Sequence, residues 1–283
     1  QTGGCGECSV LINGELLRSC NLPLEEGMDI RTDHDSLLEY PPRRIISIKR
    51  PPPSHHLTLF THGCNFNCPI CHNWDITFSS IGDAFTPEEV IQKLNVDENN
   101  DYWVGISGGE PTLNREWLLQ TVRLLRKNNP GIRIQLDTNA SILTPEYIDQ
   151  LVYCGISDIS PDIKAFKLDT FMHVTGIKDS NLATEYLNSS WNSVRYINET
   201  DKDKIFLAIG LACHPHFHSR EELESIGQAL YQINPALPIN LIEYQPGFRK
   251  RNWPNVSNRA MKNAHQLLIK QGLEKVIIQG GPS

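Results

Sequence analysis

Long apolar runs are absent from this 283-residue sequence. None approaches the roughly 20 residues that a membrane-spanning helix requires. The first residues also lack the basic and apolar regions of a secretion signal. We therefore expect no membrane association and predict a cytoplasmic protein, unless a targeting segment precedes Gln1.

An excess of positive charge is also missing. The chain has 26 Lys and Arg against 33 Asp and Glu, a net charge of −7, which argues against nonspecific binding of nucleic acid. Residues 1–40 carry eight acids against Arg18 and Arg31. This acidic segment is typical of a solvated surface, and the alternative is that it helps to dock a redox partner.

Cysteine, in contrast, is plentiful. Six of the eight cysteines form two tight groups and two stand alone: Cys5, Cys8 and Cys20; Cys64, Cys68 and Cys71; Cys154 and Cys213. Close spacings in a chain with no secretion signal favour metal sites over disulfides.

Short apolar runs alternate with amphipathic stretches from about residue 55 onward. Strands are expected at residues 57–61, 102–107, 132–138, 157–163, 205–212, 238–244 and 275–279. Helices are expected to start at residues 86–89, 114 and 144–146, and to cover residues 219–232 and 257–271. This alternation predicts an α/β fold with a parallel sheet. Six or seven such units indicate a partial or complete (β/α) barrel, whose chemistry would lie at the C-terminal ends of the strands.

A small β-rich segment is expected ahead of the barrel. Residues 8–20 have the pattern of a hairpin around Asn13-Gly14, which would gather the first cysteine group at one end. The stretch PPRRIISIKRPPP favours a boundary, because proline cannot donate a ladder hydrogen bond, although IISI can add one strand. We therefore divide the chain into a ferredoxin-like segment (1–40), a linker (41–54) and a barrel domain (55–283).

The loop after the first barrel strand, THGCNFNCPICHN, carries Cys64, Cys68 and Cys71 with three and two residues between them. Three such thiolates can ligate three irons of a cubane and leave the fourth iron open for chemistry. The alternative for this loop alone is a zinc site completed by His62 or His72.

The second barrel strand ends in GGEP, where Gly108 and Gly109 permit a close backbone approach to a ligand and Glu110 adds a carboxylate. With this motif one unit after the cysteine loop, the chain resembles the radical S-adenosylmethionine (SAM) superfamily over about residues 57–279. The segments CHN, SGGEPTL, LDTNA and DIK are most similar to glycyl-radical-enzyme activating enzymes, of which pyruvate formate-lyase activase is the type.

The resemblance implies a [4Fe-4S] cluster on Cys64, Cys68 and Cys71, with SAM chelated at its open iron. It also implies that the methionyl part of SAM is contacted by Gly108, Gly109 and Glu110. A monovalent cation (Na⁺ or K⁺) beside the SAM carboxylate would be held by Asp137, Thr138 and Asp162. The pocket would be completed by Lys164 and Gln245. Asp162 and Lys164, two residues apart on an extended segment, should point to the same side. Reductive cleavage of SAM would give a 5′-deoxyadenosyl radical that abstracts hydrogen, a step that needs no side-chain acid or base.

Four further features of the sequence bear on the site or the core. Ile70 stands where this superfamily usually has an aromatic residue, which leaves open whether the adenine of SAM packs against this position. Cys213 and three histidines, His214, His216 and His218, follow the fifth strand. One interpretation is a second metal site or a radical relay through Cys213, and the other is ordinary hydrogen bonding. The basic stretch 248–253 either grips an anionic substrate or partner or is a solvated loop. Cys154 is interpreted as core packing.

The N-terminal cysteine spacing resembles the two-iron ferredoxin domain of succinate dehydrogenase iron-sulfur subunits over about the first 40 residues. It implies a [2Fe-2S] cluster on Cys5, Cys8 and Cys20 that delivers electrons to the radical centre. Because such a cluster takes four thiolates, we predict a cysteine immediately before Gln1 in a longer native chain. A zinc site, or no metal at all, is the alternative.

Three functions fit these motifs. The first is a radical SAM oxidoreductase, anaerobic in its chemistry, that abstracts hydrogen from a protein or peptide as a glycyl-radical activase does, with an electron donor such as ferredoxin or flavodoxin. The second applies the same chemistry to a small molecule or nucleic acid, because the motifs describe the cofactor rather than the target. The third is a non-catalytic iron-sulfur electron carrier or redox sensor, which would leave GGEP, Asp137 and Asp162 without a role.

Overall fold

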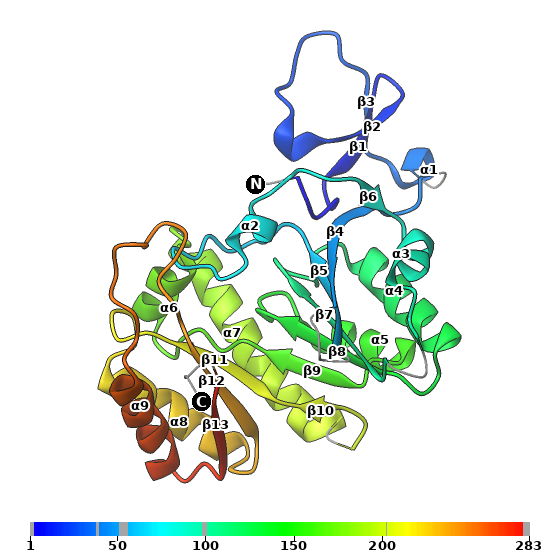
Figure 1. The fold of residues 1–283 in the computed structure, drawn as a ribbon. Coiled ribbons are helices and arrows are strands. Elements are labelled where there is room, and N and C mark those ends of the chain that lie inside the picture. The colour runs from blue at the N-terminus through cyan, green and yellow to red at the C-terminus, as the bar shows by residue number, and fades with distance from the viewer. Residues whose placement is uncertain (1–2, 38–39, 51–55, 98–100, 202, 280–283) are drawn as a thin grey trace. The chain divides into compact units, whose positions relative to one another are not determined.

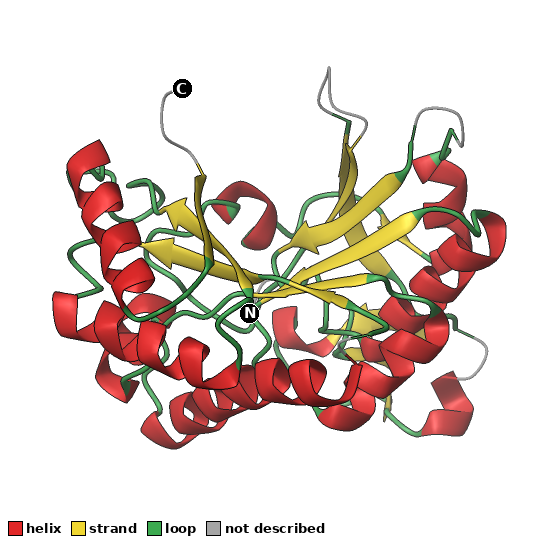
Figure 2. Ribbon diagram, turned by 90° about the horizontal axis from the view of Figure 1, so that it is seen from below, coloured by secondary structure: helices red, strands yellow, loops and turns green. Residues whose placement is uncertain are grey.

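The computed structural model describes residues 3–37, 40–50, 56–97, 101–201 and 203–279. Its chain divides into two compact units, one of Gln1–Asn65, Asn73–Leu136 and Cys154–Ile156 and the other of Phe66–His72, Asp137–Tyr153 and Ser157–Ser283. Figure 1 gives the order of the elements, and Figure 2 shows the same chain coloured by secondary structure. Residues 51–54 of the predicted linker lie outside the described residues.

The first unit begins with a small antiparallel sheet in the order β2-β1-β3: β1 (Ser9–Ile12), β2 (Glu15–Arg18) and β3 (Ile30–Arg31). A short 3₁₀ helix, η1 (Ser19–Asn21), follows β2, and α1 (His34–Leu37) follows β3. Asn13 and Gly14 join β1 to β2 with φ angles of 52° and 83°. These are the left-handed conformations of a type I′ turn, so the hairpin prediction is confirmed.

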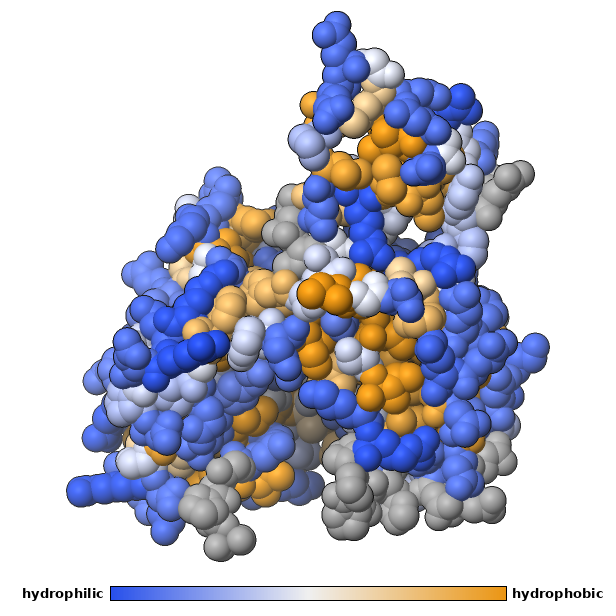
Figure 3. Space-filling model, turned by 45° about the horizontal axis from the view of Figure 1, so that its top comes forward, coloured by the Kyte–Doolittle hydropathy of each residue, from blue (hydrophilic) through white to orange (hydrophobic). Residues whose placement is uncertain are grey.

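This N-terminal segment has a small core. Among its described residues, the buried apolar side chains are Val10, Leu11 and Ile12, whereas Leu24 is 76% exposed. Figure 3 shows further apolar side chains on its surface. A core of this size does not stabilise a separate domain, so the segment also depends on its contacts with the rest of the first unit.

The rest of the first unit is a mixed sheet with the strand order β8-β7-β5-β4-β6. Its strands are β4 (Arg44–Lys49), β5 (His56–Thr61), β6 (Ala84–Phe85), β7 (Trp103–Gly108) and β8 (Arg133–Thr138). β5, β7 and β8 run parallel, and β4 pairs antiparallel with β5, so the IISI strand is confirmed. The helices are α2 (Trp74–Thr77), α3 (Pro87–Leu94) and α4 (Arg115–Asn128).

The second unit contains a parallel sheet of β11 (Ile209–Cys213), β12 (Pro238–Glu243) and β13 (Lys275–Gln279). β9 (Asp158–Pro161) pairs in parallel with β10 (Phe206–Leu207). Its helices are α5 (Pro145–Cys154), α6 (Leu168–Thr175), α7 (Ser180–Tyr196), α8 (Arg220–Ile233) and α9 (Asn258–Lys270), with a π-helical turn, η2 (Ile197–Asp201), after α7.

The predicted strands and helices are all present, which confirms an α/β fold with parallel strands after a β-rich segment. α6 and α7 are additional, because the sequence analysis predicted no helix between β9 and β11. In the part of the chain that the structure describes, no helix has the length and apolar character needed to cross a membrane.

Candidate active site

The GGEP turn is bonded to the strand that leads into the cysteine loop. β5 and β7 are parallel neighbours in which Thr61 pairs with Gly108. The Gly109 amide donates to the Thr61 carbonyl at 2.7 Å. The next amide, of Glu110, donates to the Gly63 carbonyl at 2.8 Å. A Cβ atom on Gly109 would lie 2.1 Å from the Gly63 carbonyl oxygen, so this close approach requires glycine.

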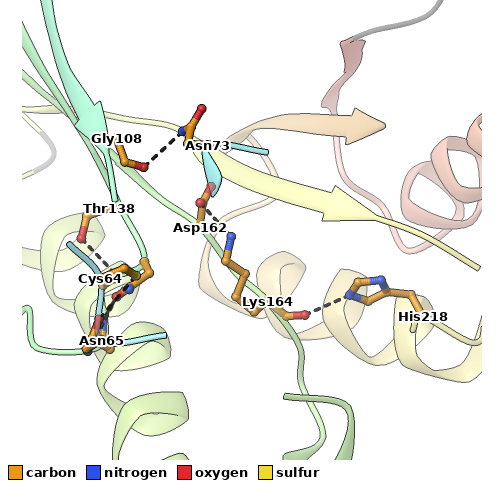
Figure 4. A network of polar contacts seen from close by, with 11 residues as sticks. Cys64, Asn65, Asn73, Gly108, Thr138, Asp162, Lys164 and His218 are labelled. Carbon is orange, nitrogen blue, oxygen red and sulfur yellow. Dashed lines mark hydrogen bonds and ion pairs between the residues drawn. The ribbon is translucent and has the colours of Figure 1, made fainter. Parts of the chain in front are cut away.

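Glu110 and Asn73 fix the turn further. Glu110 is fully buried, and its carboxylate accepts hydrogen bonds from the amide (3.0 Å) and the hydroxyl (2.6 Å) of Thr112. Asn73, in the CHN segment, donates to the Gly108 carbonyl at 3.1 Å (Figure 4). The turn predicted to contact SAM thus has one well-defined conformation, and its contacts with SAM stay a prediction.

Arg44 is a residue of this region that the sequence analysis did not single out. It begins β4, is fully buried, and its guanidinium lies 5.9 Å from the centroid of the Trp117 ring. The guanidinium donates to four main-chain carbonyls, those of His62, Glu110, Pro111 and Leu113. One buried cation therefore ties the residues around the GGEP turn to the start of the cysteine loop. No spacing rule could have found it, because its partners are up to 69 residues away.

The thiol of Cys64, in the first unit, lies 3.9 Å from the side-chain oxygen of Asn65 (Figure 4). Cys68 and Cys71 belong to the second unit, where Cys68 is buried and Cys71 half-buried. Burial raises the pKa of the Cys68 thiol to about 11, although the charge of Lys164 acts in the opposite direction. Tyr244 also donates its hydroxyl to the Cys68 sulfur. These two thiols are therefore close to one buried cation and one phenol.

The segment with these two thiols is anchored at Asn67 and at Pro69. The Asn67 amide donates to the Thr175 carbonyl at 2.8 Å, at the C-terminal end of α6. The Arg249 amide donates to the Pro69 carbonyl at 3.1 Å, and its guanidinium bonds the Asn67 side chain at 2.6 Å. The basic stretch 248–253 therefore packs on the cysteine segment through Arg249.

Two of the singled-out positions are part of the core. Ile70 is fully buried in an apolar cluster with Phe217 and Tyr244. Cys154 ends α5, is 4% exposed and accepts a hydrogen bond from the Arg123 guanidinium at 3.6 Å. The core role predicted for Cys154 is confirmed.

Asp162 and Lys164 point to the same side, as predicted, and pair at 2.9 Å (Figure 4). The Lys164 side chain is 11% exposed. Burial lowers the pKa of its ammonium, but the charges of Asp162, Cys68 and Cys71 outweigh this, so the net pKa is raised. Lys164 therefore stays charged beside the two thiols.

The three residues predicted to hold a cation all belong to the second unit, where Thr138 and Asp162 are bonded to each other. The Asp162 amide donates to the Thr138 carbonyl at 2.8 Å, and Thr138 is buried at the end of β8. Asp137, next to it, is half-buried. Cation binding by these three residues stays a prediction.

Gln245 and the two histidines of the zinc alternative have other partners. The Gln245 amide donates to His72 Nε2 at 2.9 Å, and its side chain bonds the carboxylate of Glu243. The ring nitrogens of His62 bond the Ser47 hydroxyl at 2.9 Å and the Ser79 carbonyl at 3.1 Å. Both histidines thus use ring nitrogens in hydrogen bonds, which weakens the zinc interpretation of this loop.

Cys213 lies at the end of β11, is 4% exposed, and burial raises its pKa to about 12. The neighbouring histidine rings have partners: His214 bonds the Pro254 carbonyl and the His216 amide, His218 bonds the His214 amide, and the His216 ring stacks on Trp253. For His214 and His218, these bonds favour the interpretation as ordinary hydrogen-bonding side chains. Within the described residues, no three His, Cys, Asp or Glu side chains converge on a point that could hold a single metal ion.

The N-terminal thiols are gathered, as the hairpin predicted. All eight cysteines of the chain are described, and none forms a disulfide. Burial raises the pKa of Cys20, and a hydrogen bond with Cys8 and the charges of Cys8 and Cys5 raise it further. The Ser19 amide donates to the Cys8 carbonyl at 3.0 Å, which brings the next residue, Cys20, to this site. A cluster distributes its thiolates over several irons, so its ligands need not converge on one ion.

Cys5 also contacts Gly63, at the start of the loop that carries Cys64. A Cβ atom on Gly63, whose φ is 83°, would lie 2.8 Å from the Cys5 amide nitrogen and 3.0 Å from its Cβ. Asn114 donates to the Cys5 carbonyl at 3.2 Å, and the Ile45 amide donates to the Gly4 carbonyl at 3.2 Å. Cys5 is therefore packed against Gly63, the residue that precedes Cys64.

A model of the radical SAM superfamily matches residues 58–199 of the chain. A candidate GTP 3′,8-cyclase of Thermoplasma volcanium is 33% identical over 115 residues, which cover 40% of this chain and 34% of the cyclase. A candidate glycyl-radical enzyme activating enzyme of Methanocaldococcus jannaschii is 25% identical over 202 residues, which cover 69% of this chain and 78% of that protein. The chain thus spans about a third of the length of the first relative and over three quarters of the second.

Among solved structures, coproporphyrinogen III oxidase (HemN) of Escherichia coli, a radical SAM enzyme, is similar with a TM-score of 0.50 and 16% identity. The likeness covers 75% of this chain and 52% of HemN, and it shows a shared fold.

Proposed function

Because the chain belongs to the radical SAM superfamily, we propose that it cleaves SAM reductively at a [4Fe-4S] cluster and abstracts hydrogen from a protein or peptide. Cys64, Cys68 and Cys71 would hold the cluster. The observation that carries the proposal is the hydrogen bonding between the ends of β5 and β7. The amides of Gly109 and Glu110, in the GGEP turn, donate to the carbonyls of Thr61 and Gly63, at the start of the cysteine loop. An electron carrier or sensor would leave the Asp162–Lys164 pair beside Cys68 and Cys71 without a role.

The residues present fit these groups by their chemistry. Thiols are the ligands that iron-sulfur clusters take, and Tyr244 donates a hydrogen bond to one of them. Lys164 offers a cation for the SAM carboxylate, and Asp137, Thr138 and Asp162 offer oxygen ligands for a monovalent cation. When bound, the cluster and SAM supply one-electron cleavage of the sulfonium, which gives methionine and a 5′-deoxyadenosyl radical that takes a hydrogen atom from the substrate.

Two similarities bear on the substrate. The likeness to a candidate glycyl-radical enzyme activating enzyme covers 69% of the chain and supports a protein substrate, with hydrogen taken from a glycine. The likeness to a candidate GTP cyclase has the higher identity over a shorter stretch, and it favours a nucleotide-like small molecule as the second candidate.

Electrons would enter through the N-terminal segment. Cys5, Cys8 and Cys20 would hold a [2Fe-2S] cluster together with one further ligand, and a ferredoxin or flavodoxin would reduce it. Two observations support this role: Cys20 interacts with both other thiols, and Cys5 lies against Gly63. The small apolar core of this segment also fits a fold that a metal centre stabilises.

The test uses the full chain after anaerobic cluster reconstitution. With dithionite and SAM we expect 5′-deoxyadenosine, and Cys68→Ala should abolish it, whereas Cys154→Ala, a matched change outside both cysteine groups, should not. Deuterium transferred from glycine-labelled cellular proteins into 5′-deoxyadenosine would support a protein substrate. No 5′-deoxyadenosine from the reconstituted wild type would refute the proposal, and transfer only from a labelled nucleotide would favour the second candidate.

A further inference from the structure

The backbone that follows Lys164 is held by two side chains at the start of α8. His218 Nε2 bonds the Lys164 carbonyl at 2.9 Å (Figure 4). Glu222 accepts hydrogen bonds from the amide of Phe166 at 2.6 Å and from the amide of Lys167 at 3.0 Å. Both side chains therefore act on one short segment, residues 164–167.

A third side chain completes the support. The Trp191 indole, on α7, donates to the Ala165 carbonyl at 3.0 Å. With it, each of the four consecutive residues has a main-chain group bonded to a side chain from α7 or from the start of α8. A loop that is held at every residue has little freedom to move its side chains.

His218 acts as one neutral tautomer. Its Nδ1 accepts a hydrogen bond from the His214 amide at 3.4 Å, so the proton is on Nε2, which donates to the Lys164 carbonyl. The residue is 4% exposed. It therefore serves as a directed hydrogen-bond donor.

Glu222 is 1% exposed, and its Oε2 atom has no hydrogen-bond partner among the described residues. Burying a carboxylate with one oxygen unpaired is costly. Its other oxygen caps the start of α6, where the N-cap residue, Lys167, makes no side-chain cap of its own. The carboxylate thus fixes both the segment and the helix that follows it.

Both ends of the held segment lead to the candidate active site of the second unit. At one end, the Lys164 ammonium pairs with Asp162 beside Cys68 and Cys71. At the other end, α6 bonds the Asn67 amide, in the segment that carries these two thiols. A shift of residues 164–167 would therefore move the Lys164 ammonium relative to Cys68 and Cys71.

We propose that His218 and Glu222 are positioning residues for SAM: by fixing residues 164–167 they keep the Lys164 ammonium where it meets the SAM carboxylate. This inference rests on the proposed function. Neither residue touches SAM itself, and both act through Lys164.

The experiment measures SAM affinity and the KM and kcat of SAM cleavage on the reconstituted full chain. His218→Leu removes the donor and should raise the KM for SAM about tenfold, with kcat little changed, as expected for one lost hydrogen bond that acts on ground-state binding. His218→Gln keeps an N–H that can reach the Lys164 carbonyl and should restore most of the affinity. Glu222→Gln should give a similar loss, because an amide bonds the two main-chain amides more weakly than a carboxylate.

A double-mutant cycle separates positioning from general destabilisation. In a Lys164→Met background, His218→Leu should cause no further change in SAM affinity, because the two residues act as one unit. Glu221→Gln, an exposed neighbour on the same turn of α8, is the matched control and should leave affinity unchanged.

The outcomes are distinguishable. If the wild type binds SAM but His218→Leu and Glu222→Gln bind it equally well, the positioning role is overturned, even if both variants melt at a lower temperature. Additive effects of His218→Leu and Lys164→Met would overturn it as well. A wild type that neither binds nor cleaves SAM refutes the proposed function, and the positioning role with it.

Discussion

At the scale of single residues, the glycines of the GGEP turn are required by backbone contacts within the protein itself. Gly109 must lie against the Gly63 carbonyl, and Gly108 adopts a φ of 117° while its Cβ would lie 2.4 Å from the Thr61 carbonyl oxygen. The sequence predicted that these glycines permit a close approach. It could not show that the partner is the strand before the cysteine loop, because that depends on the pairing of β5 with β7.

Gly109→Ala should therefore destabilise the protein by about 3 kcal/mol, since the methyl group would overlap a carbonyl that is fixed by its own hydrogen bond. Urea unfolding at pH 7.5 measures this. The matched control is Gly105→Ala in β7, the strand that precedes the turn, where the new Cβ would lie 3.7 Å from Thr58, an ordinary contact. Equal unfolding midpoints for both variants would contradict the steric argument.

Arg44 gives a second prediction at this scale. Arg44→Met should lower the free energy of unfolding by about 3 kcal/mol or more, because several buried carbonyls would lose their donor. The adjacent Arg43→Met removes a half-exposed pair with Glu89 and should have a much smaller effect. Urea unfolding of the two variants compares them directly, and equal losses would show that burial of Arg44 is not what matters.

At the scale of elements, the strands and most helices follow from apolar periodicity and N-cap residues. The helix start predicted at residues 86–89 is one confirmed case, and the structure adds a capping box of Thr86 and Glu89. α7 was missed because part of its buried face is polar. Ser190 and Ser193 are buried in it and bond carbonyls three residues earlier in the helix. Such a helix hides its core side from a pattern based on apolar residues.

The site was predictable only as far as motifs extend. The cysteines, GGEP, Asp162 and Lys164 carry a recognisable spacing, and the pairing of Asp162 with Lys164 followed from a two-residue step. The contacts of His218 and Glu222 join residues 54 to 56 positions apart along the chain. Pairings of that range are set by how helices pack, which no local pattern records.

His218 gives a prediction on pH at this scale. Burial lowers its pKa below the usual value of about 6.5, although the Lys164 and His214 backbone and the charge of Glu222 raise it in part. Below pH 6.5 the unfolded chain then binds more protons than the folded one, so stability should be full above pH 6.5 and fall as the pH drops toward the folded pKa. The loss is at most about 1.4 kcal/mol per pH unit for one histidine.

Urea unfolding of wild type and His218→Gln at pH 7.5 and 5.5 isolates this term. Other histidines with lowered pKa, such as His62 and His72, remain in both proteins and cancel in the difference. The variant should lose less stability than the wild type on acidification. An identical loss in both would show that His218 does not titrate in this range.

At the scale of the whole molecule, the proposed chemistry needs an electron path that ends at the radical centre. The N-terminal segment is suited to begin it, because Cys5 packs against Gly63, the residue before Cys64. Its acidic charge would face a basic patch on a donor protein. If electrons enter through this segment, loss of its cluster should lower SAM cleavage driven by a protein donor. Cleavage driven by a small reductant should not change, because such a reductant reaches the [4Fe-4S] cluster directly.

Cys20→Ser should therefore separate two activities of the intact protein. It removes one thiol of the N-terminal group, so the two-iron spectroscopic signal should disappear and ferredoxin-driven formation of 5′-deoxyadenosine should fall to background. Dithionite-driven formation should persist, because Cys64, Cys68 and Cys71 are unchanged. Cys154→Ala, which alters a buried cysteine of α5 outside both groups, should keep both activities and both signals. If Cys20→Ser retained the two-iron signal, or lost the dithionite-driven activity to the same extent, the N-terminal segment would not be a separate electron inlet.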